Sequence, residues 1–318
     1  TYNKALSFNP DYADAYNHKG NALQEQGDLK EAIASYKKAL SLKPNYAQAF
    51  YNIGNALLKQ GKPDEAIASY KKALSLKPNY ADGYNNMGSA LQRKNKLVEA
   101  IASYSKALTI KPDYEAVRAQ KLHQQAHICD WPGIKVDEAH LADLGTTRQS
   151  VLPFTLLSFE DAPQRHRMRS QLYAQEKVPY NLLPLNTSHF LKAKKIRIGY
   201  FSTDFREHPV AYLIAKVFQL HNRDKFEIFG YSLHGSEKSE VRRRIAKSFD
   251  CFIDVQDMSD KEVTLRARQD KIDIAIDLTG YTENGRSGIF AHRAAPIQIN
   301  FLGYPGTLGA DFIDYIVA

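Results

Sequence analysis

The sequence is poor in cysteine, and Cys129 and Cys251 are too few for a disulfide framework or a paired-cysteine metal site. No hydrophobic run approaches the roughly 20 residues that a membrane-spanning helix needs, and we expect no signal peptide. Acidic residues are outnumbered, with 35 Asp and Glu against 43 Lys and Arg, but the two signs are interleaved and no long basic run forms. We therefore expect a cytoplasmic protein that binds neither membranes nor nucleic acid.

Two further kinds of site lack their usual residues. No G-x-G-x-x-G or Walker A sequence occurs, so no standard phosphate-binding loop is predicted. His123 and His127 have the i,i+4 spacing that suits two metal ligands on one helix, but no third ligand completes a recognisable site. Packing or solvent exposure is the more ordinary role for these histidines, and we expect no metal ion.

A repeat of 34 residues occupies the first third of the chain. This interval separates four prolines, four tyrosines that follow them, three glycines and three alanines: Pro10, Pro44, Pro78 and Pro112; Tyr12, Tyr46, Tyr80 and Tyr114; Gly20, Gly54 and Gly88; Ala32, Ala66 and Ala100. The period and its content predict tetratricopeptide repeats, with one helix around "AYNHKGNALQEQG" and a second around "EAIASYKKALSLKP". Because a single repeat cannot bury its own apolar face, stacked repeats share a core and leave a concave surface for an extended partner.

Asparagines recur on the first helix of these repeats. Asn52 and Asn86 are in register with His18, and Asn55 lies three residues after Asn52. Asparagine is a mediocre helix former, but its amide can donate to and accept from a peptide backbone. Two interpretations stay open: Asn52 and Asn86 form a ladder that binds an extended polypeptide, or they are solvated positions copied by duplication.

The second half of the chain alternates between strand-like and helix-like segments. A helical connector is predicted for residues 116–194, between repeats at 1–115 and a lobe at 195–318. Strands are predicted at "KIRIGYFS", "FEIFGYSL", "CFIDV", "IDIAIDLTG" and "IQINFLGYP", with helices near 210–221, 237–248, 259–269 and 284–292. The predicted fold class is therefore α plus α/β, a tetratricopeptide-repeat superhelix followed by a Rossmann-like doubly wound lobe.

Both ends of the sequence suggest truncation. The opening "TYNKALSFNP" aligns with "SYKKALSLKP", so the chain is expected to begin inside the second helix of an earlier repeat. The last strand-like segment, "DFIDYIVA", has no following helix to cover it, although parallel sheets are normally covered on both faces.

Three polar loops follow predicted strands and are expected to meet at one edge of the sheet. They are "STDFREHPV", "LTGYTENGR" and "GYPGTLGAD", and they contribute His208, Asp204, Tyr281, Thr282 and several glycine amides. Open α/β sheets bind ligands at this carboxyl edge. Pro209 restricts the backbone of His208, which suits a histidine held in a fixed orientation. A structural or solvated role for His208 remains the alternative to a catalytic one.

These motifs resemble a known family. "RIGYFSTDFREHPVAYLI", "IDIAIDLTGYTENGR", "RAAPIQINFLGYPGTLGADFIDYIV" and "ICDWPG", all behind tetratricopeptide repeats, are similar to the protein O-linked N-acetylglucosamine transferase and SPINDLY family of glycosyltransferases. The resemblance implies that the repeats present a protein acceptor to a two-lobed nucleotide-sugar transferase. It also implies that the sugar is transferred to a serine or threonine hydroxyl.

The same resemblance implies roles for particular residues. The family's active-site histidine, considered as a general base, corresponds to His208, within a motif that also contains Asp204 and Pro209. The acceptor side of the cleft corresponds to two motifs, Gly280-Tyr281-Thr282 and Leu302-Gly303-Tyr304-Pro305. The donor, expected to be UDP-N-acetylglucosamine, belongs mainly to a carboxyl-terminal lobe that is missing here. The chain alone is therefore expected to be inactive.

Two alternatives to this function are kept. SPINDLY-type relatives share the motifs, so the donor could be GDP-fucose and the enzyme a protein O-fucosyltransferase. The second alternative belongs to a different class of protein. It is a non-catalytic peptide-binding repeat scaffold, in which the α/β lobe is only a docking module.

Overall fold

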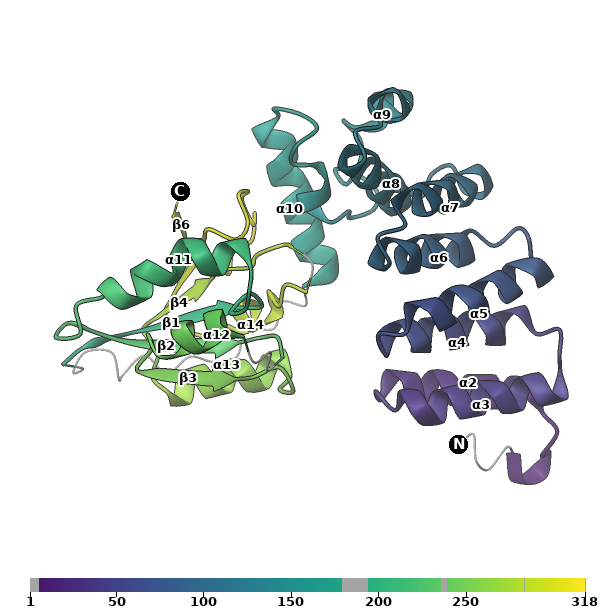
Figure 1. Cartoon of the computed structure of the whole chain (residues 1–318), viewed down its shortest axis with the longest axis horizontal. Coiled ribbons are helices and arrows are strands. Elements are labelled where there is room, and N and C mark those ends of the chain that lie inside the picture. Colours follow the sequence, from purple (N-terminus) through teal and green to yellow (C-terminus); the bar gives the residue numbers. More distant parts are fainter. Residues whose placement is uncertain (1–5, 179–193, 236–238, 283, 318) are drawn as a thin grey trace. The chain divides into compact units, whose positions relative to one another are not determined.

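The computed structural model describes residues 6–178, 194–235, 239–282 and 284–317 (Figure 1). The chain divides into two compact units, Thr1–Leu141 and Ala142–Ala318. The segment predicted as a connector is shared between them, because its first helix packs on the last repeat and a later helix joins the core of the second unit. No helix among the described residues is long and apolar enough to span a membrane.

The first unit consists of helices, each packed against the next in the chain. The first helices of consecutive repeats, α2, α4 and α6, also contact one another. The helices are α2 (Ala13–Glu25), α3 (Leu29–Leu42), α4 (Ala47–Lys59), α5 (Pro63–Leu76), α6 (Ala81–Arg93), α7 (Leu97–Ile110), α8 (Glu115–His127), α9 (Trp131–Asp137) and η1 (Glu138–His140). The predicted repeat architecture is confirmed.

The recurring glycine and tyrosine explain how the two helices of a repeat pack so closely. A Cβ atom at Gly54 would lie 2.4 Å from a ring carbon of Tyr70, and Gly20 and Gly88 stand in the same relation to Tyr36 and Tyr104. All three tyrosines are completely buried. The 34-residue interval in the sequence is thus a repeated steric contact, in which a missing side chain makes room for an aromatic ring.

The second unit is built on a six-stranded sheet in which every pair of neighbouring strands is parallel. The strand order is β3-β2-β1-β4-β5-β6, so the predicted doubly wound sheet is confirmed. The strands are β1 (Ile196–Ser202), β2 (Phe226–Ser232), β3 (Cys251–Asp254), β4 (Ile274–Asp277), β5 (Ile297–Phe301) and β6 (Tyr315–Val317). The helical elements are η2 (Pro153–Leu156), α10 (Pro163–Lys177), α11 (Pro209–Leu220), α12 (Glu240–Ala246), α13 (Asp260–Gln269) and α14 (Gly288–Ala291).

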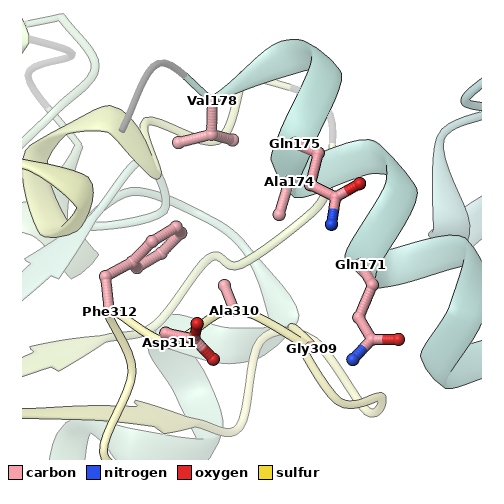
Figure 2. Close-up of a pocket in the computed structure, with 8 residues that line it drawn as sticks. All are labelled: Gln171, Ala174, Gln175, Val178, Gly309, Ala310, Asp311 and Phe312. Carbon is pink, nitrogen blue, oxygen red and sulfur yellow. The ribbon is translucent and has the colours of Figure 1, made fainter. Parts of the chain in front are cut away.

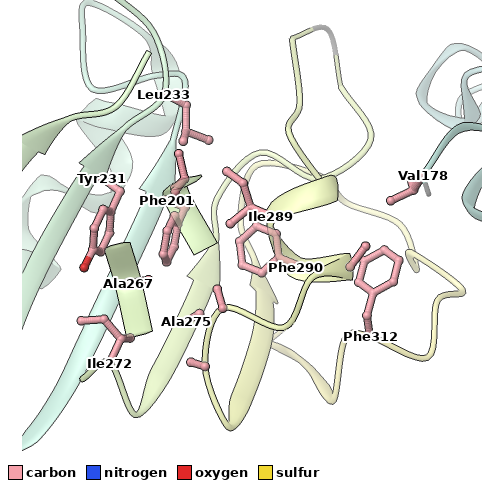
Figure 3. Close-up of a cluster of buried hydrophobic side chains, with 14 of the residues drawn as sticks. Val178, Phe201, Tyr231, Leu233, Ala267, Ile272, Ala275, Ile289, Phe290 and Phe312 are labelled. Carbon is pink, nitrogen blue, oxygen red and sulfur yellow. The ribbon is translucent and has the colours of Figure 1, made fainter. Parts of the chain in front are cut away.

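Apolar clusters cover both faces of the sheet. Phe201 of β1 stacks on Tyr231 at 4.5 Å between ring centroids, in the cluster that Figure 3 shows. Tyr200, the preceding residue, belongs to a different cluster with Phe218 of α11. Successive strand residues point to opposite faces, so this division places a separate core on each side of the sheet. Ala174 and Val178, in and just after α10, join the first cluster, which makes α10 part of this unit's core.

Candidate functional site

Three loops meet at the carboxyl edge of β1, β4 and β5, as the sequence predicts. The backbone N–H of Thr203, after β1, donates to the hydroxyl of Thr279, after β4, at 3.3 Å. A Cβ atom at Gly280 would lie 2.5 Å from Cβ of Tyr304, so the loops after β4 and β5 are packed together. The strand order reverses between β1 and β4, and in open α/β sheets the crevice at such a switch point is where ligands bind.

His208 is the residue that immediately precedes helix α11. Its Nδ1 accepts a hydrogen bond from the backbone N–H of Val210 at 3.3 Å, which caps the helix. Pro209 follows at the first helical position, where its missing N–H costs nothing. The His208 side chain is about one-third exposed, at 35%. The imidazole is therefore held by the helix end while part of its surface faces solvent.

The tautomer of His208 follows from this cap. A neutral imidazole has one protonated nitrogen, and Nδ1 is the acceptor here, so the proton belongs on Nε2. Asp204 Oδ2 lies 3.7 Å from Nδ1, which is too long for a hydrogen bond that would reverse this assignment. In the observed arrangement His208 offers an N–H donor at Nε2 rather than a free basic nitrogen.

Asp204 holds the loop between β1 and α11. It is 8% exposed, its N–H donates to the hydroxyl of Ser202 at 2.9 Å, and its Oδ1 accepts from Arg206 at 3.3 Å. Pro209 is exposed at the start of the helix. Among the residues predicted from this motif, His208 and Pro209 are accessible to a substrate, whereas Asp204 stabilises the loop from within.

Asp277, at the end of β4, organises the loop that follows it. No sequence pattern had indicated this role. Its Oδ1 accepts hydrogen bonds from the backbone N–H groups of Thr279 at 2.9 Å and Gly280 at 3.0 Å. Gly280 adopts a positive φ of 59°, and the Thr282 hydroxyl donates to the Thr279 carbonyl at 3.1 Å. Desolvation by burial raises the pKa of Asp277 to about 6, although the two N–H donors oppose the shift.

We expect Asp277→Asn to stabilise the second unit near neutral pH. The folded pKa of about 6 exceeds the ordinary value of 3.8, so folding takes up a proton between these values and stability falls as pH rises through this window. The asparagine Oδ1 can still accept both N–H groups, and the buried charge is removed. Thermal unfolding should give a gain of up to about 3 kcal/mol at neutral pH and little gain near pH 4.

The matched control for this substitution is Asp224→Asn, because Asp224 is an exposed carboxylate of the same unit. The stability of the Asp224→Asn variant should differ little from that of the unchanged chain, both at neutral pH and near pH 4. An equal gain from Asp277→Asn at both pH values would contradict the assignment of the gain to the buried charge.

The tyrosines of the two predicted acceptor motifs lie beneath the loops. Tyr281 and Tyr304 are each 2% exposed, with ring centroids 5.8 Å apart, and Tyr281 lies 4.9 Å from the ring of Tyr173 on α10. Burial raises the pKa of Tyr304 to about 12 and that of Tyr281 further. These phenols therefore remain protonated near neutral pH, and their observed role is to pack the loops against α10.

The turn after β5 is equally constrained. Leu302 has a positive φ of 69°, and a Cβ atom on Gly303 would lie 1.7 Å from the carbonyl oxygen of Leu278. Pro305 is exposed, whereas Leu302 is partly buried. Gly303 is thus required for the close approach of two loops, and Pro305 is the residue of this motif most open to a ligand.

A small cavity lies beside the loop after β4. Its volume is about 150 Å³, and Thr282, Tyr281 and Lys177 are among the residues that line it. Arg286 also lines it, but its guanidinium donates to Asp260 Oδ1 at 2.7 Å and to the Met258 carbonyl at 2.6 Å. Arg286 therefore braces the loop, and no feature of the sequence pattern had singled it out.

The repeat asparagines Asn52 and Asn86 connect consecutive repeats. The amide nitrogen of Asn52 donates to Asn17 and to Asn21, each at 3.0 Å, and Asn52 is 7% exposed. The amide nitrogen of Asn86 donates to Asn55 at 2.8 Å and to the Tyr51 hydroxyl at 2.9 Å. These amides are not simply solvated copies, because they form hydrogen bonds across the repeat boundary. Whether they also bind a polypeptide stays a prediction.

Known sequence families match both parts of the chain. Residues 170–318 match glycosyl transferase family 41. Tetratricopeptide repeats match at residues 1–34, 20–61, 54–95 and 81–114.

Curated relatives are similar over part of the chain. A probable UDP-N-acetylglucosamine--peptide N-acetylglucosaminyltransferase SEC of Arabidopsis thaliana is 46% identical over 124 residues, which are 39% of this chain and 13% of that protein. The UDP-N-acetylglucosamine--peptide N-acetylglucosaminyltransferase of Caenorhabditis elegans is 38% identical over 39% of this chain and 11% of its own length. A SPINDLY protein of Arabidopsis thaliana is 34% identical over 38% of this chain and 14% of its own. The matches thus cover less than a sixth of each relative.

A solved structure supports the fold over almost the whole chain. A mutant of the Thermobaculum terrenum O-GlcNAc transferase matches with a TM-score of 0.56 and 23% sequence identity, covering 96% of this chain and 53% of that one.

Proposed function

Because the chain belongs to the O-linked N-acetylglucosamine transferase and SPINDLY family, glycosyl transferase family 41, we propose that it is the acceptor-side part of a protein O-glycosyltransferase. The full reaction transfers N-acetylglucosamine from UDP-N-acetylglucosamine to a serine or threonine hydroxyl of a protein. The observation that carries this proposal is His208, which lies partly exposed at the switch point of a doubly wound sheet, in a chain that also contains tetratricopeptide repeats.

This chain's own residues supply the acceptor half of the chemistry. Nε2–H of His208 can donate a hydrogen bond to an acceptor or sugar oxygen and fix its direction of attack. The helix cap and the Asp277 turn hold the two flanking loops in place before substrate arrives, which reduces the entropy lost on binding.

We assign most of the donor's diphosphate contacts to residues outside this chain. The arginines in the two flanking loops are already bound to carboxylates, Arg206 to Asp204 and Arg286 to Asp260. A diphosphate leaving group needs cations or helix N-termini that are free to stabilise it. On this proposal the chain alone does not catalyse transfer, and cytoplasmic localisation stays a prediction.

The function is tested in a family-length protein that contains this chain. Supplied with labelled UDP-N-acetylglucosamine or GDP-fucose and a protein acceptor, it should transfer N-acetylglucosamine to serine or threonine, detected by mass spectrometry. Transfer of fucose instead would identify the alternative donor. Transfer from neither donor, by a folded protein that binds acceptor peptides, would favour the non-catalytic scaffold.

We expect the double substitution Asn52→Ala and Asn86→Ala to lower the binding affinity of many unrelated acceptor peptides to a similar degree. An amide that binds the peptide backbone does not read side chains, so the loss should not depend on peptide sequence. The same change removes hydrogen bonds between repeats, each worth about 1 kcal/mol, so thermal unfolding must be measured beside the peptide titrations.

Tyr114→Phe is the matched control for the asparagine pair. It removes the hydrogen bond from the Tyr114 hydroxyl to Asp82 Oδ1, which also crosses a repeat boundary, and leaves both asparagines and their hydrogen-bond partners in place. If the control lowers peptide affinity as much as the asparagine variant does, the asparagines act only by holding the repeats together.

A further inference from the structure

A second cavity lies between α10 and the loop that follows β5 (Figure 2). Its volume is about 300 Å³, twice that of the cavity beside the loop after β4. Four residues in and just after α10 and four consecutive residues of the loop line it: Gln171, Ala174, Gln175, Val178, Gly309, Ala310, Asp311 and Phe312. Gly309, Ala310 and Asp311 end the predicted polar loop "GYPGTLGAD", but neither the motifs carried over from the family nor the proposed reaction assigns a role to this cavity.

The cavity has an apolar part and a polar part. Ala174, Val178 and Phe312 provide apolar surface, and Figure 2 shows the Phe312 ring on the same side as Val178. Gln171 and Gln175 lie one helical turn apart on α10, so their amides follow one another along the cavity wall. An apolar surface beside convergent polar groups is the usual composition of a specific ligand site.

The walls of this cavity are held in place by tight packing. Gly309 has a positive φ of 57°, and a Cβ atom there would lie 3.0 Å from the backbone nitrogen of Gln171. The Phe312 carbonyl accepts a hydrogen bond from the buried Gln298 side chain at 2.5 Å. Because the loop is fixed at both ends of the segment that lines the cavity, a ligand would enter a largely preformed space, and little free energy would be lost to reorganising the loop.

Asp311 is the only charged side chain among the described residues that line this cavity. Its carboxylate is exposed and forms no ion pair with any residue in the described part of the chain. The neighbouring carboxylate, Asp314, is instead bound to Arg293 at 2.8 Å. Among the residues that the structure describes, the lining thus carries one negative charge without an ion-pair partner, and no lysine or arginine.

We propose that this cavity binds a lysine or arginine side chain presented by a polypeptide. The aliphatic stem of such a side chain would pack on Ala174, Val178 and Phe312, while its cation would reach Asp311. The amides of Gln171 and Gln175 match the donors and acceptors of the peptide groups that flank the side chain. An acidic side chain would be repelled by Asp311, and a purely apolar one would leave the polar wall unpaired. The assignment stands whether or not the chain is part of a transferase.

The test is a titration of the 318-residue chain with short peptides, followed by NMR of the methyl groups of Ala174, Ala310 and Val178. The probes are acetyl-Gly-Lys-Gly-amide and the same peptide with norleucine in place of lysine, which keeps the whole aliphatic stem and lacks the ammonium group. The lysine peptide should bind about fivefold more tightly, the factor expected for an exposed ion pair worth about 1 kcal/mol. The arginine peptide should behave like the lysine peptide.

Asp311→Asn should abolish the preference for lysine over norleucine. Asp257→Asn, which removes another exposed carboxylate of the same unit, should leave the preference intact. Equal binding of the two peptides to the unchanged chain, an equal effect of the two substitutions, or binding without shifts at the cavity methyls would each overturn the proposal. Cadaverine binding as tightly as the lysine peptide would overturn the assignment to a polypeptide.

Discussion

Replacing His208 with alanine is expected to lower turnover about 10²–10⁴-fold in a family-length transferase that contains this chain. The substitution removes a partly exposed imidazole that the start of α11 holds at the carboxyl edge of the sheet. The helix loses one capping hydrogen bond, worth about 1 kcal/mol, so the fold should survive. Peptide binding by the repeats should be largely unchanged, because the repeats belong to the first compact unit and His208 belongs to the second.

His208→Gln separates two roles for the histidine. If Nε2–H positions an oxygen, the glutamine amide nitrogen can replace that donor and should recover part of the lost turnover. If His208 accepts a proton during the reaction, glutamine cannot do so and should be as slow as alanine. The cap on Nδ1 favours the first outcome, because it places the proton of the neutral ring on Nε2.

The pH profile of turnover gives a second test of the same question. An enzyme whose base must accept a proton loses activity as the pH falls and that base becomes protonated. With a positioning role, the acidic limb of the profile should persist in His208→Gln because another group produces it. Disappearance of that limb would identify His208 as the base.

His221→Gln is the matched control for both histidine variants. This ring lies just after the last residue of α11, where it contacts the Tyr200 hydroxyl and the Val217 carbonyl, each at 2.9 Å. It has no part in the loops at the carboxyl edge, so turnover should remain within about twofold of the unchanged enzyme. Near-normal turnover in His208→Ala would remove His208 from the mechanism.

The fold could be predicted from the sequence because its two patterns have simple physical causes. The 34-residue interval arises from a steric contact, the ring of Tyr70 against Gly54, that each repeat must reproduce. The alternation of strand and helix arises because the strands are covered on both faces, with Tyr200 and Phe201 in separate cores. Patterns of this kind depend on local sequence and are visible along the chain.

The packing of the site could not be predicted in the same way, because it depends on contacts between distant residues. Tyr281 and Tyr304 resemble ligand-binding residues in a polar loop, yet both are buried against α10, more than a hundred residues earlier. The role of Asp277 depends on two backbone N–H groups of the turn that follows it. The repeat interval correctly placed Asn52 and Asn86 at equivalent positions of consecutive repeats. Their hydrogen bonds across the repeat boundary could be identified only in the folded structure.

Gly303→Ala is expected to destabilise the second unit by about 3 kcal/mol or more, which is a large share of the stability of a typical domain. The added Cβ atom would lie 1.7 Å from the carbonyl oxygen of Leu278 and 2.7 Å from its carbon. Both are backbone atoms of the chain leaving β4, so no side-chain rotation can relieve the overlap. The loops after β4 and β5 would have to separate. The packing of Tyr281 against Tyr304, which these loops carry, would then be disrupted as well.

Gly235→Ala is the matched control for this substitution, because it adds the same methyl group elsewhere in the second unit. Among the described residues, the new Cβ would there meet the end of the Gln256 side chain at 2.8 Å, and that side chain can move away. Thermal unfolding followed by circular dichroism should give a lower Tm for Gly303→Ala and a small change for Gly235→Ala. If Gly303→Ala instead unfolds at the same temperature as the unchanged chain, the two loops are not in the close contact observed here. The carboxyl edge of the sheet would then have to form by a different arrangement of these residues.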